Sequence, residues 1–590
     1  MWKPFKQSLI AIMLLAGAAH AASPADPSKV VRVAFEVADD GFDLAHTSNA
    51  YSIWVGEAIF EPLLTYDYVA RPAKLVALAA EAMPEVADRG KTYVFRIKKG
   101  IYFTPDAAFK GKRHELTAQD YIYTIERLVD PKNRSPSANF VEGKIVGLDD
   151  LARAAKKSGH FDYDAPVAGL RAVDRYTLRI ALNKPDYNFL YVMAYNGLGA
   201  VAREVIEAYG SQSGQHPVGT GPYMLSDYVA RSKIILTANP DYRGYIWDFK
   251  SSGDAWDDQM VRDMKGKKMP QIGRVEISII EEEQSRWLAF ADKQLDFDKL
   301  PQVAAPTVLD GDKLKPEYAA QKIALNRVVM PEIIYTSFNM KDPVIGGYGK
   351  EKIALRRAVS MIYSLKDDIA QARNGQAVKA QMIVPVGVVG HDEHYRTSID
   401  EYNIGLANQL LDRFGYRRGA DGYRSMPDGK PLLLKISGEP DATSKIYAEI
   451  WKRGLDQIGV RADFLTSNFA DNMKAATECK LMIWGAAWGA DYPEGENFLQ
   501  LLYGPNSGQG NNSCYQSAAY DALYVKAMGL PPGPERNALY AQMNRQMEAD
   551  TPWVLNLSRV RNWVVRPWVK GFKKHPILSA DWQHLDIEKH

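Results

Sequence analysis

Cysteine, net charge and long apolar runs are all scarce in this sequence. Its 590 residues include two cysteines, which argues against a thiol–disulfide catalyst and against a cysteine-rich zinc site. Lys and Arg total 73 and Asp and Glu total 71, so there is no basic field to attract nucleic acid or anionic lipid. Beyond the first 21 residues no window reaches the length of a membrane span. We therefore expect neither a nucleic-acid partner nor direct membrane insertion.

Motifs for catalysis and for metal binding are missing as well. The chain has no G-x-S-x-G, no H-E-x-x-H, no Walker loop and no C-x-x-C pair. Gly219-Thr220-Gly221 lacks the further glycines and the lysine of a phosphate loop, which favours a structural turn. His391-Asp392-Glu393-His394 is a local cluster of metal-binding residue types, but it follows the Val/Gly-rich stretch 384–390, which is typical of a solvated loop. The sequence predicts no metal, no cofactor and no enzyme.

The N-terminus predicts export. Lys3 and Lys6 precede the apolar run Leu9–Ala19, and Ala19-His20-Ala21 forms an A-x-A site, so residues 1–21 are interpreted as a signal peptide cleaved after Ala21. No cysteine stands at that site, so we expect a periplasmic protein without a lipid anchor. In an oxidising compartment Cys479 and Cys514 either form a disulfide or remain two buried thiols.

The length predicts at least two lobes, because 590 residues exceed what one hydrophobic core accommodates. In the first half, alternating apolar patterns predict strands, and Thr117 to Asp120 resembles a capping box that begins a helix. The strands expected there are 30–36, 91–99, 176–182, 223–228, 233–238 and 274–280, and the helices are those around 53–59, 121–129 and 283–292.

From Ile333 onward, strands and helices alternate, which predicts a largely parallel sheet with helices on its faces. The strands expected are 333–339, 432–437, 460–465, 481–488 and 553–560, and the helices are 353–372, 402–414, 442–458, 520–528 and 535–547.

The stretch Lys480–Leu502 is the most informative part of the chain. Leu481–Trp488 is apolar and uncharged, which predicts a strand buried on both faces at the centre of the sheet. After the break at Gly489, Asp491 lies just past the carboxyl end of that strand, where open α/β sheets bind ligands. The alternative is that Asp491 merely caps a short helix over residues 493–502.

Seven segments in a fixed order resemble the peptide/nickel/opine class of periplasmic solute-binding proteins, bacterial solute-binding protein family five, which feed ABC importers. They are residues 57–63 (EAIFEPL), 92–103 (TYVFR and GIYF), 218–223 (VGTGPY), 239–242 (NPDY), 337–339 (SFN), 355–358 (LRRA) and 488–492 (WGADY). The resemblance covers nearly the whole mature chain.

The resemblance implies an α/β, two-lobed periplasmic binding protein (type II, cluster C) that closes over its ligand, with an extra subdomain in the N-terminal lobe. By that analogy lobe I combines residues 22–68, 203–330 and 555–590, the inserted subdomain is 69–202, and lobe II is 331–554. Hinge crossings are then expected at 328–333 and 553–560.

The resemblance also implies the ligand contacts. In peptide-binding members the acid of the motif matching Trp488–Tyr492 binds the α-ammonium of the ligand, which assigns that role to Asp491, with Tyr492 beside it. Backbone groups of Ala487, Trp488 and Gly489, and of Ser48, Asn49 and Ala50 across the cleft, are then expected to bond an extended peptide. The expected partners are a small peptide and the permease subunits of an importer, and the protein is expected to be a monomer.

Two departures concern the carboxyl end of the ligand. Dipeptide-binding relatives carry an arginine in the loop that here reads Gly438-Glu439-Pro440, and an oligopeptide-binding relative has an arginine at the position of Gly485. Either the peptide is longer and its end is held elsewhere, or the cargo is another amine-bearing solute such as an opine or a modified sugar. A secreted hydrolase and a periplasmic chaperone remain as alternatives of other classes.

Overall fold

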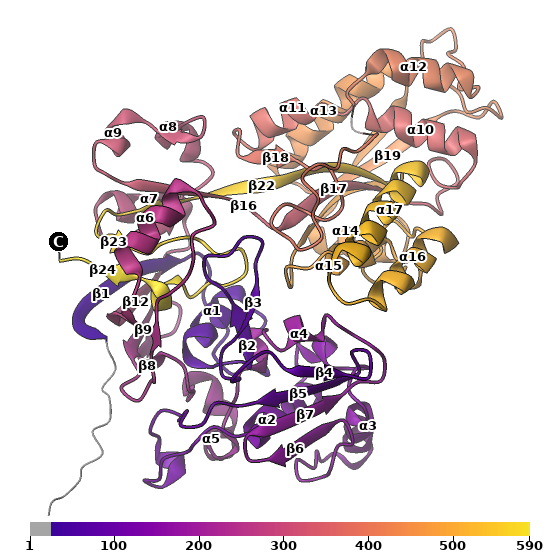
Figure 1. Cartoon of the computed structure of the whole chain (residues 1–590). Coiled ribbons are helices and arrows are strands. Elements are labelled where there is room, and N and C mark those ends of the chain that lie inside the picture. Colours follow the sequence, from indigo (N-terminus) through magenta and orange to yellow (C-terminus); the bar gives the residue numbers. More distant parts are fainter. Residues whose placement is uncertain (1–24, 400, 590) are drawn as a thin grey trace, which may run out of the picture.

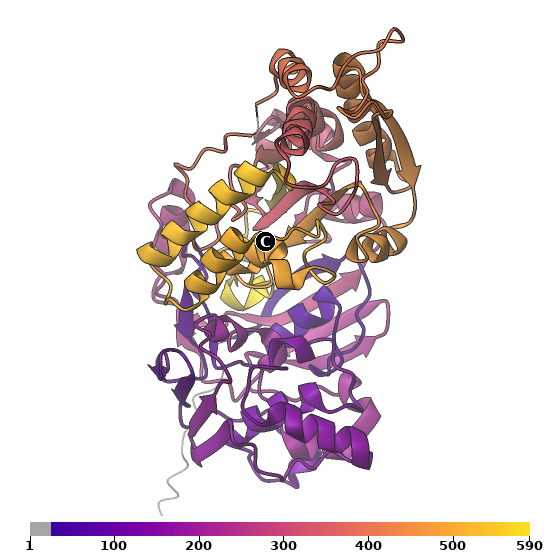
Figure 2. The ribbon, with the colours of Figure 1, turned by 90° about the vertical axis from the view of Figure 1, so that its right-hand side faces the viewer.

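The chain folds into two lobes joined by long strands (Figure 1). The structure is a computed structural model that describes residues 25–399 and 401–589, so the predicted signal peptide lies outside the described residues. The first lobe comprises the indigo and magenta parts of the ribbon and the yellow C-terminal tail, and the second lobe comprises the parts coloured from salmon through orange to gold (Figures 1 and 2). Within the described ranges no helix combines the length and the apolar character needed to cross a bilayer.

A four-stranded sheet forms the core of the first lobe. In spatial order its strands are β1 (Asp26–Phe35), β12 (Ile272–Ile279), β9 (Lys233–Ala238) and β8 (Tyr223–Val229), and only the first pair is parallel. Helix α1 (Ala50–Ile59) ends against the turn before β8. A Cβ atom on Gly219 would lie 2.0 Å from the carbonyl oxygen of Ile59, so this turn requires glycine. The prediction of a structural turn is confirmed.

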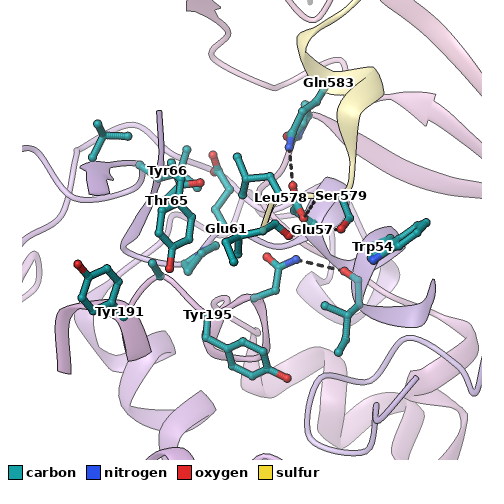
Figure 3. Close-up of a pocket in the computed structure, with 18 of the residues that line it drawn as sticks. Trp54, Glu57, Glu61, Thr65, Tyr66, Tyr191, Tyr195, Leu578, Ser579 and Gln583 are labelled. Carbon is teal, nitrogen blue, oxygen red and sulfur yellow. Dashed lines mark hydrogen bonds between the residues drawn. The ribbon is translucent and has the colours of Figure 1, made fainter. Parts of the chain in front are cut away.

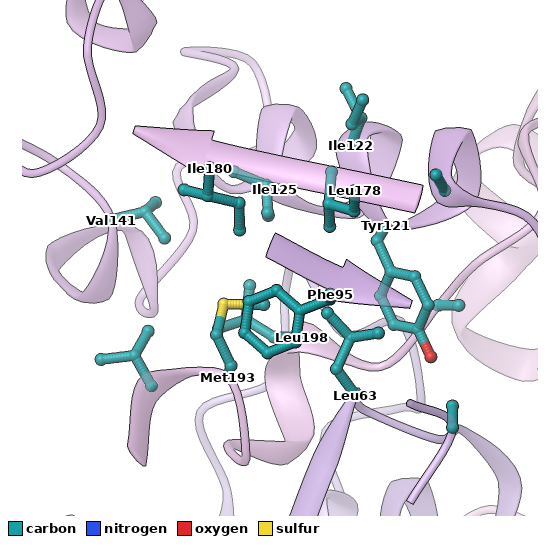
Figure 4. Packing of buried hydrophobic residues seen from close by; sticks show 14 of the residues in the cluster. Leu63, Phe95, Tyr121, Ile122, Ile125, Val141, Leu178, Ile180, Met193 and Leu198 are labelled. Carbon is teal, nitrogen blue, oxygen red and sulfur yellow. The ribbon is translucent and has the colours of Figure 1, made fainter. Parts of the chain in front are cut away.

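The first lobe contains a second four-stranded sheet, of order β4 (Glu85–Ala87), β5 (Thr92–Arg96), β7 (Thr177–Ala181) and β6 (Leu170–Asp174). Helix α2 (Ala118–Val129) begins at the predicted capping box of Thr117 and Asp120. Its apolar side chains and those of β5 and β7 share one core with Leu63, Met193 and Leu198 (Figure 4).

The first lobe has further elements, most of them short. They include β2 (Leu64–Tyr66), β3 (Leu75–Ala77), α3 (Leu148–Ser158), α4 (Phe189–Val192), α5 (Arg203–Tyr209), β10 (Tyr245–Ile246), α6 (Ala255–Met264), β11 (Lys268–Met269), α7 (Glu283–Ala291), α8 (Ala305–Val308), β14 (Leu309–Asp310), β15 (Lys313–Leu314), α9 (Pro316–Ala319), β23 (Val569–Lys570) and β24 (Asp586–Ile587).

The sheet of the second lobe is mixed rather than largely parallel. Its strands β21 (Ile483–Gly489), β19 (Leu433–Gly438) and β20 (Arg461–Thr466) are parallel, because α13 (Ala442–Ile458) and α14 (Phe469–Thr477) form the crossovers between them. On the other side of β21, however, β17 (Glu332–Phe338) is antiparallel to it. The prediction of a parallel sheet was wrong because β17 enters from the first lobe and belongs to no such unit.

Two connections carry the chain between the lobes. Strand β16 (Ala324–Val329) leads through Met330 and Pro331 into β17. Strand β22 (Trp553–Val565) is continuous: its first half pairs with β17 and β18 (Ala377–Lys379), and its second half pairs with β16 and β13 (Phe297–Lys299). The two lobes therefore share one sheet through β22 (Figure 1).

The single long helix predicted over 353–372 is wrong. Helix α10 (Lys350–Ser360) ends first, and α11 (Leu365–Asp367) then leads into a π-helical turn, Asp368–Ala372. The Ser364 side chain accepts a hydrogen bond from the N–H of Asp367, which begins the new helix. The other helices of this lobe are α12 (Ile404–Arg413), α15 (Glu496–Leu499), α16 (Ala518–Met528) and α17 (Pro534–Asp550).

Strand β21 occupies the predicted central place, but it is not buried on both faces. Ile483 and Trp484 are buried, whereas Gly485, Ala487 and Gly489 are exposed, because one face of the strand lines an open cleft. A disulfide joins Cys479 and Cys514, whose Cα atoms are 6.1 Å apart, and so closes the loop that contains β21.

Candidate binding cleft

Two cavities lie along the cleft, one in each lobe. The first-lobe cavity, of about 760 Å³, is lined by α1, β2, β3 and the tail segment 576–584, and the second lobe contributes only Ala490 and Asp491 to its lining. The second-lobe cavity, of about 540 Å³, is lined by residues of β17, β19, β21, α13 and β22. Cavities of this size accommodate small-molecule or peptide ligands.

Aromatic side chains dominate the wall of the first-lobe cavity. They are Trp54, Tyr66, Phe140, Tyr191, Tyr195, Tyr242, Tyr245 and Phe249, and Figure 3 shows several of them around one space. Such rings provide large apolar contact areas, and tyrosine hydroxyls add hydrogen bonds at the edge. This wall suits a ligand with apolar or aromatic side chains.

Two carboxylates in this wall have partners within the protein. Glu61 is 1% exposed and forms a bidentate ion pair with Arg243 at 2.7 and 2.8 Å, and the Thr220 hydroxyl donates to it at 3.0 Å. Glu57 accepts from the N–H of Ser579 at 2.9 Å and from Gln583 (Figure 3).

The pKa of Glu57 is raised to about 7. Burial of its carboxyl group is the main cause, and the negative Asp581 adds to it, whereas the Ser579 N–H and the Lys574 ammonium act in the opposite direction. At neutral pH this group is therefore close to half ionised.

Asp491 lies at the rim where the two lobes meet. Its Oδ2 accepts a hydrogen bond from the amide of Asn497 at 2.9 Å, and its own N–H donates to the Asn497 side chain at 3.0 Å. Burial in the cleft raises the pKa of Asp491, Asn497 lowers it, and the nearby Glu496 raises it further. The interpretation of Asp491 as a helix cap is wrong, because Gly495 is the N-cap of α15.

The predicted residues of β21 present a strand edge. Strand β17 pairs with β21 along its whole length, but β19 pairs with it only at Ile483 and Trp484. Within the described parts of the chain, no strand covers the other edge from Gly485 to Gly489. The indole of Trp488 donates to Asn497 at 3.1 Å, so the amide that holds Asp491 also fixes this strand end. Ala487 lines the second-lobe cavity.

The predicted residues of the first lobe divide into two groups. Ser48 and Ala50 line the same cavity as Asp491. Asn49 is instead the N-cap of α1: its side chain accepts from the N–H of Tyr51 and donates to the Ala38 carbonyl. Ser48 also donates twice to Asp40, which fixes the approach to α1.

Tyr492 does not line either of the two large cavities but joins the lobes. Its ring stacks on Tyr191 of the first lobe at 5.6 Å between centroids, and its hydroxyl donates to Glu496 at 2.5 Å. Beside it, the Asn188 amide donates to Glu494 and Glu496 across the cleft at 3.4 and 3.1 Å. These contacts connect α4 with the segment that follows β21.

The cluster 391–394 is a loop in the structure. His391 contacts the Val384 carbonyl at 2.8 Å, and Asp392 accepts from the N–H of His394. Among the described residues, no group of three or more His, Cys, Asp or Glu side chains is placed to hold a metal ion.

Sequence reasoning missed Glu57 as a cavity residue, as well as the tail residues Ser579 and Gln583 and the whole second-lobe cavity. Glu57 had a signal, since it is an acid within an otherwise apolar helix. The tail lies more than 500 residues away from it in sequence and had none.

A family model describing bacterial extracellular solute-binding proteins, family 5, matches residues 74–510. The chain belongs to this family. It is therefore a solute-binding protein, from a family that is not one of enzymes.

Curated relatives and solved structures agree with this assignment. The chain is 24% identical to heme-binding protein A of Haemophilus influenzae, over 83% of the chain and 80% of that protein. It is 24% identical to the periplasmic oligopeptide-binding protein OppA of Salmonella typhimurium, over 99% of both. A solved structure of the periplasmic murein tripeptide binding protein MppA, in its unliganded open form, superposes with a TM-score of 0.73 at 20% identity and covers 97% of this chain and 99% of its own. The prediction of a two-lobed α/β periplasmic binding fold is confirmed.

Proposed function

We propose that this protein is the substrate-binding component of an ABC importer and that it captures oligopeptides between its lobes. The observation that carries the proposal is Asp491, a carboxylate at the rim of the cleft that forms no ion pair with the described residues. It stands directly beside the uncovered strand edge from Gly485 to Gly489. The similarity to OppA, which is named for oligopeptide binding, agrees with this cargo.

The α-ammonium of a peptide fits Asp491 chemically. An ammonium brings three donors and one positive charge, and the Asn497 amide leaves the remaining lone pairs of the carboxylate free to accept them. Because burial raises the pKa of Asp491, a bound cation also offsets the cost of holding its negative charge in the cleft.

The strand edge fits the peptide backbone. In a strand, successive residues direct their N–H and C=O groups to alternate edges, so every second residue between Gly485 and Gly489 faces away from β17. An extended peptide laid there adds a strand and bonds through main-chain atoms, independently of its side chains. Ser48 and Ala50 line the first-lobe cavity together with Asp491, which follows this strand edge in the chain.

Closure of the lobes completes the proposal. We assign residues 22–68, 203–330 and 555–590 to lobe I, 69–202 to its inserted subdomain and 331–554 to lobe II. Bending at the link between β16 and β17, and within β22, then moves the lobes together and removes the ligand from water. The protein performs no bond chemistry and delivers its cargo to a permease as an exported monomer.

Analysis of bound cargo by mass spectrometry after gentle purification and denaturation tests this function. We expect a set of short peptides with free amino termini, and peptide affinity about 100-fold lower in Asp491→Asn because a charge-assisted contact in a desolvated site is lost. Asp150→Asn, an exposed acid on α3, is the matched control and should bind as the wild type does. Release of a single non-peptide compound, or equal peptide affinity in Asp491→Asn, would contradict the proposal.

A further inference from the structure

Glu57 is the one charged residue of α1, and within the described chain it has hydrogen bonds but no ion pair. Its oxygens accept from the Ser579 N–H and the Gln583 amide, which are neutral donors (Figure 3). A carboxylate withdrawn from water costs free energy unless a positive charge balances it. The side chain is half-buried and lines the first-lobe cavity, so a cation in that cavity would supply the missing charge.

The lysine next to Glu57 is already paired. Lys574 Nζ donates to the Asp581 carboxylate at 2.8 Å and to the Leu578 carbonyl at 3.0 Å, and both charged side chains are buried. The two members of this pair act on the pKa of Glu57 in opposite directions, since Lys574 lowers it and Asp581 raises it. The pair therefore leaves Glu57 without a counter-ion.

The other charges of the cavity wall belong to a second group. Arg243 and Glu61 balance each other at 2.7 Å. Lys98 donates to the Leu78 carbonyl at 2.7 Å; burial and the Arg243 guanidinium lower its pKa, whereas Glu61 and Glu81 raise it. Lys98 is thus part of the surroundings of Arg243, and it does not neutralise Glu57.

His584 adds an unused polar atom to the same wall. Its Nε2 is buried and has no hydrogen-bond partner among the described residues, while its Nδ1 lies 2.5 Å from the Tyr245 hydroxyl. Burial lowers the pKa of His584 to about 3, and the Lys574 ammonium acts in the same direction. The neutral ring does not repel a cation, and it provides a further hydrogen-bonding atom beside the carboxylate.

The rest of the wall suits an apolar stem that ends in a positive charge. Trp54, which is three residues before Glu57 on α1, lines the cavity together with Tyr66 and Tyr245. Aromatic faces attract cations, and the methylene stems of lysine and arginine pack against them. Asp491 borders the cavity from the second lobe, so a cargo held there by its α-ammonium has its first residues next to this wall.

We infer that the first-lobe cavity selects cargo with a cationic side chain near the amino terminus and that Glu57 is the counter-ion of this cation. The inference rests on the proposed function, because it starts from a peptide held at Asp491. Lysine and arginine have the required chemistry, an apolar stem with N–H donors at its end. Ser579 and Gln583 position the carboxylate, and Glu57 determines the specificity.

The ionisation of Glu57 makes the selection measurable. Since its pKa is about 7, about half of the empty molecules carry a proton on Glu57 at pH 7. A cation beside the carboxylate stabilises the ionised form, so the pKa falls and the proton leaves. At pH 7 a basic peptide should therefore release about half a proton more on binding than a neutral peptide of similar size does.

Calorimetric titration with alanine tetrapeptides tests the selection, with lysine or its uncharged analogue norleucine at the first, second or third position. At one position the lysine peptide should bind about 10- to 100-fold more tightly, as one charge-assisted pair provides. Glu57→Gln should abolish this preference and leave the affinity for the norleucine peptide unchanged, which also verifies that the variant is folded. Glu85→Gln, at an exposed carboxylate of β4, is the control and should keep the preference.

The same titrations in phosphate and in Tris, two buffers with different ionisation enthalpies, count the protons released at pH 7. The wild type should release about half a proton more with the lysine peptide than with the norleucine peptide, and Glu57→Gln should show no difference. The wild-type measurement does not depend on any variant. A Glu57 that only fastens the tail through Ser579 and Gln583 would release no additional proton.

The results that would overturn the inference are distinguishable from failure of the proposed function. If the wild type binds lysine and norleucine peptides equally at every position, if it releases no additional proton, or if Glu57→Gln keeps the preference, Glu57 does not select a cation although peptide capture stands. If the wild type binds no peptide, the proposed function fails and the inference fails with it.

Discussion

The two cavities of the cleft use the same residue types in opposite ways. In the first-lobe cavity Arg243 forms two short hydrogen bonds with Glu61, which is buried. In the second-lobe cavity Arg373 lies 3.7 Å from Asp368 and forms no hydrogen bond with the described residues. Removing one partner of a hydrogen-bonded buried pair destabilises the fold, because the other charge is left uncompensated, whereas a pair without a hydrogen bond loses little when one partner is removed. The partners of a charge, rather than its type, separate structural residues from candidate binding residues.

The largest loss of stability is expected from breaking the hydrogen-bonded pair of Arg243 and Glu61. Arg243→Met should lower the free energy of unfolding by about 4 kcal/mol, because it leaves Glu61 charged and buried without its cation. Urea unfolding at neutral pH measures this. Arg153→Met, which removes an exposed pair on α3, should cost less than about 1 kcal/mol. Equal effects of the two variants would show that the Glu61 pair is not structural.

The second largest loss of stability is expected in the loop 479–514, which contributes residues to both cavities. Replacing Cys479 and Cys514 together by serine should lower the free energy of unfolding by about 3 kcal/mol, since the disulfide closes a loop of 35 residues around β21. Unfolding curves with and without reductant should show this loss in the wild type and no further loss in the variant. If reductant leaves the wild-type curve unchanged, the bridge does not restrain this loop.

Glu57 tests whether the partners within the first-lobe cavity fully compensate a buried charge. Its pKa in the folded protein is about 7 against 4.5 in the reference state, so between these values the folded state holds the proton more tightly and stability falls as pH rises. Glu57→Gln has no such loss. Between pH 4.5 and pH 8 the free energy of unfolding of the variant should therefore rise by about 2 kcal/mol relative to that of the wild type. This figure is reduced for screening of the carboxyl group by water.

Unfolding of both proteins at pH 4.5 and pH 8 checks this prediction. Glu85→Gln, at an exposed carboxylate of β4, is the control and should follow the wild type at both values. A difference between Glu57→Gln and the wild type that does not change with pH would mean that Glu57 ionises in the folded protein as it does in the unfolded chain.

The sequence predicted the strands and the place of Asp491 better than it predicted the residues of the second-lobe cavity. The position of Asp491 at the cleft could be predicted because a strand pattern and a family motif coincide there, and the strands β17, β19, β20 and β21 fall where they were expected. The exposure of β21 could not be predicted, since glycine and alanine are as typical of a buried strand as of a strand that faces a ligand. The antiparallel β17 was missed because pairing across lobes leaves no mark in a local pattern.

Arg373 illustrates what remains hidden. It follows a helix that the apolar periodicity extended through a break at Ser364, and it precedes Asp491 by more than 100 residues. Its neighbours in the cavity come from α13 and β22, which also lie far away in sequence. Only the fold brings these groups together, and only their hydrogen-bond partners distinguish Arg373 from Arg243.

The smallest loss of stability should come from breaking the pair of Arg373 and Asp368, which has no hydrogen bond between its members. Arg373→Gln should lower the free energy of unfolding by less than about 1 kcal/mol, because Arg373 gives up no hydrogen bond within the described chain and its ion pair with Asp368 is already long. Urea unfolding beside Arg243→Met measures both under one condition. A loss as large as that of Arg243→Met would show that Arg373 is a structural residue, whereas a small loss would show that its pair with Asp368 adds little to the stability of the fold.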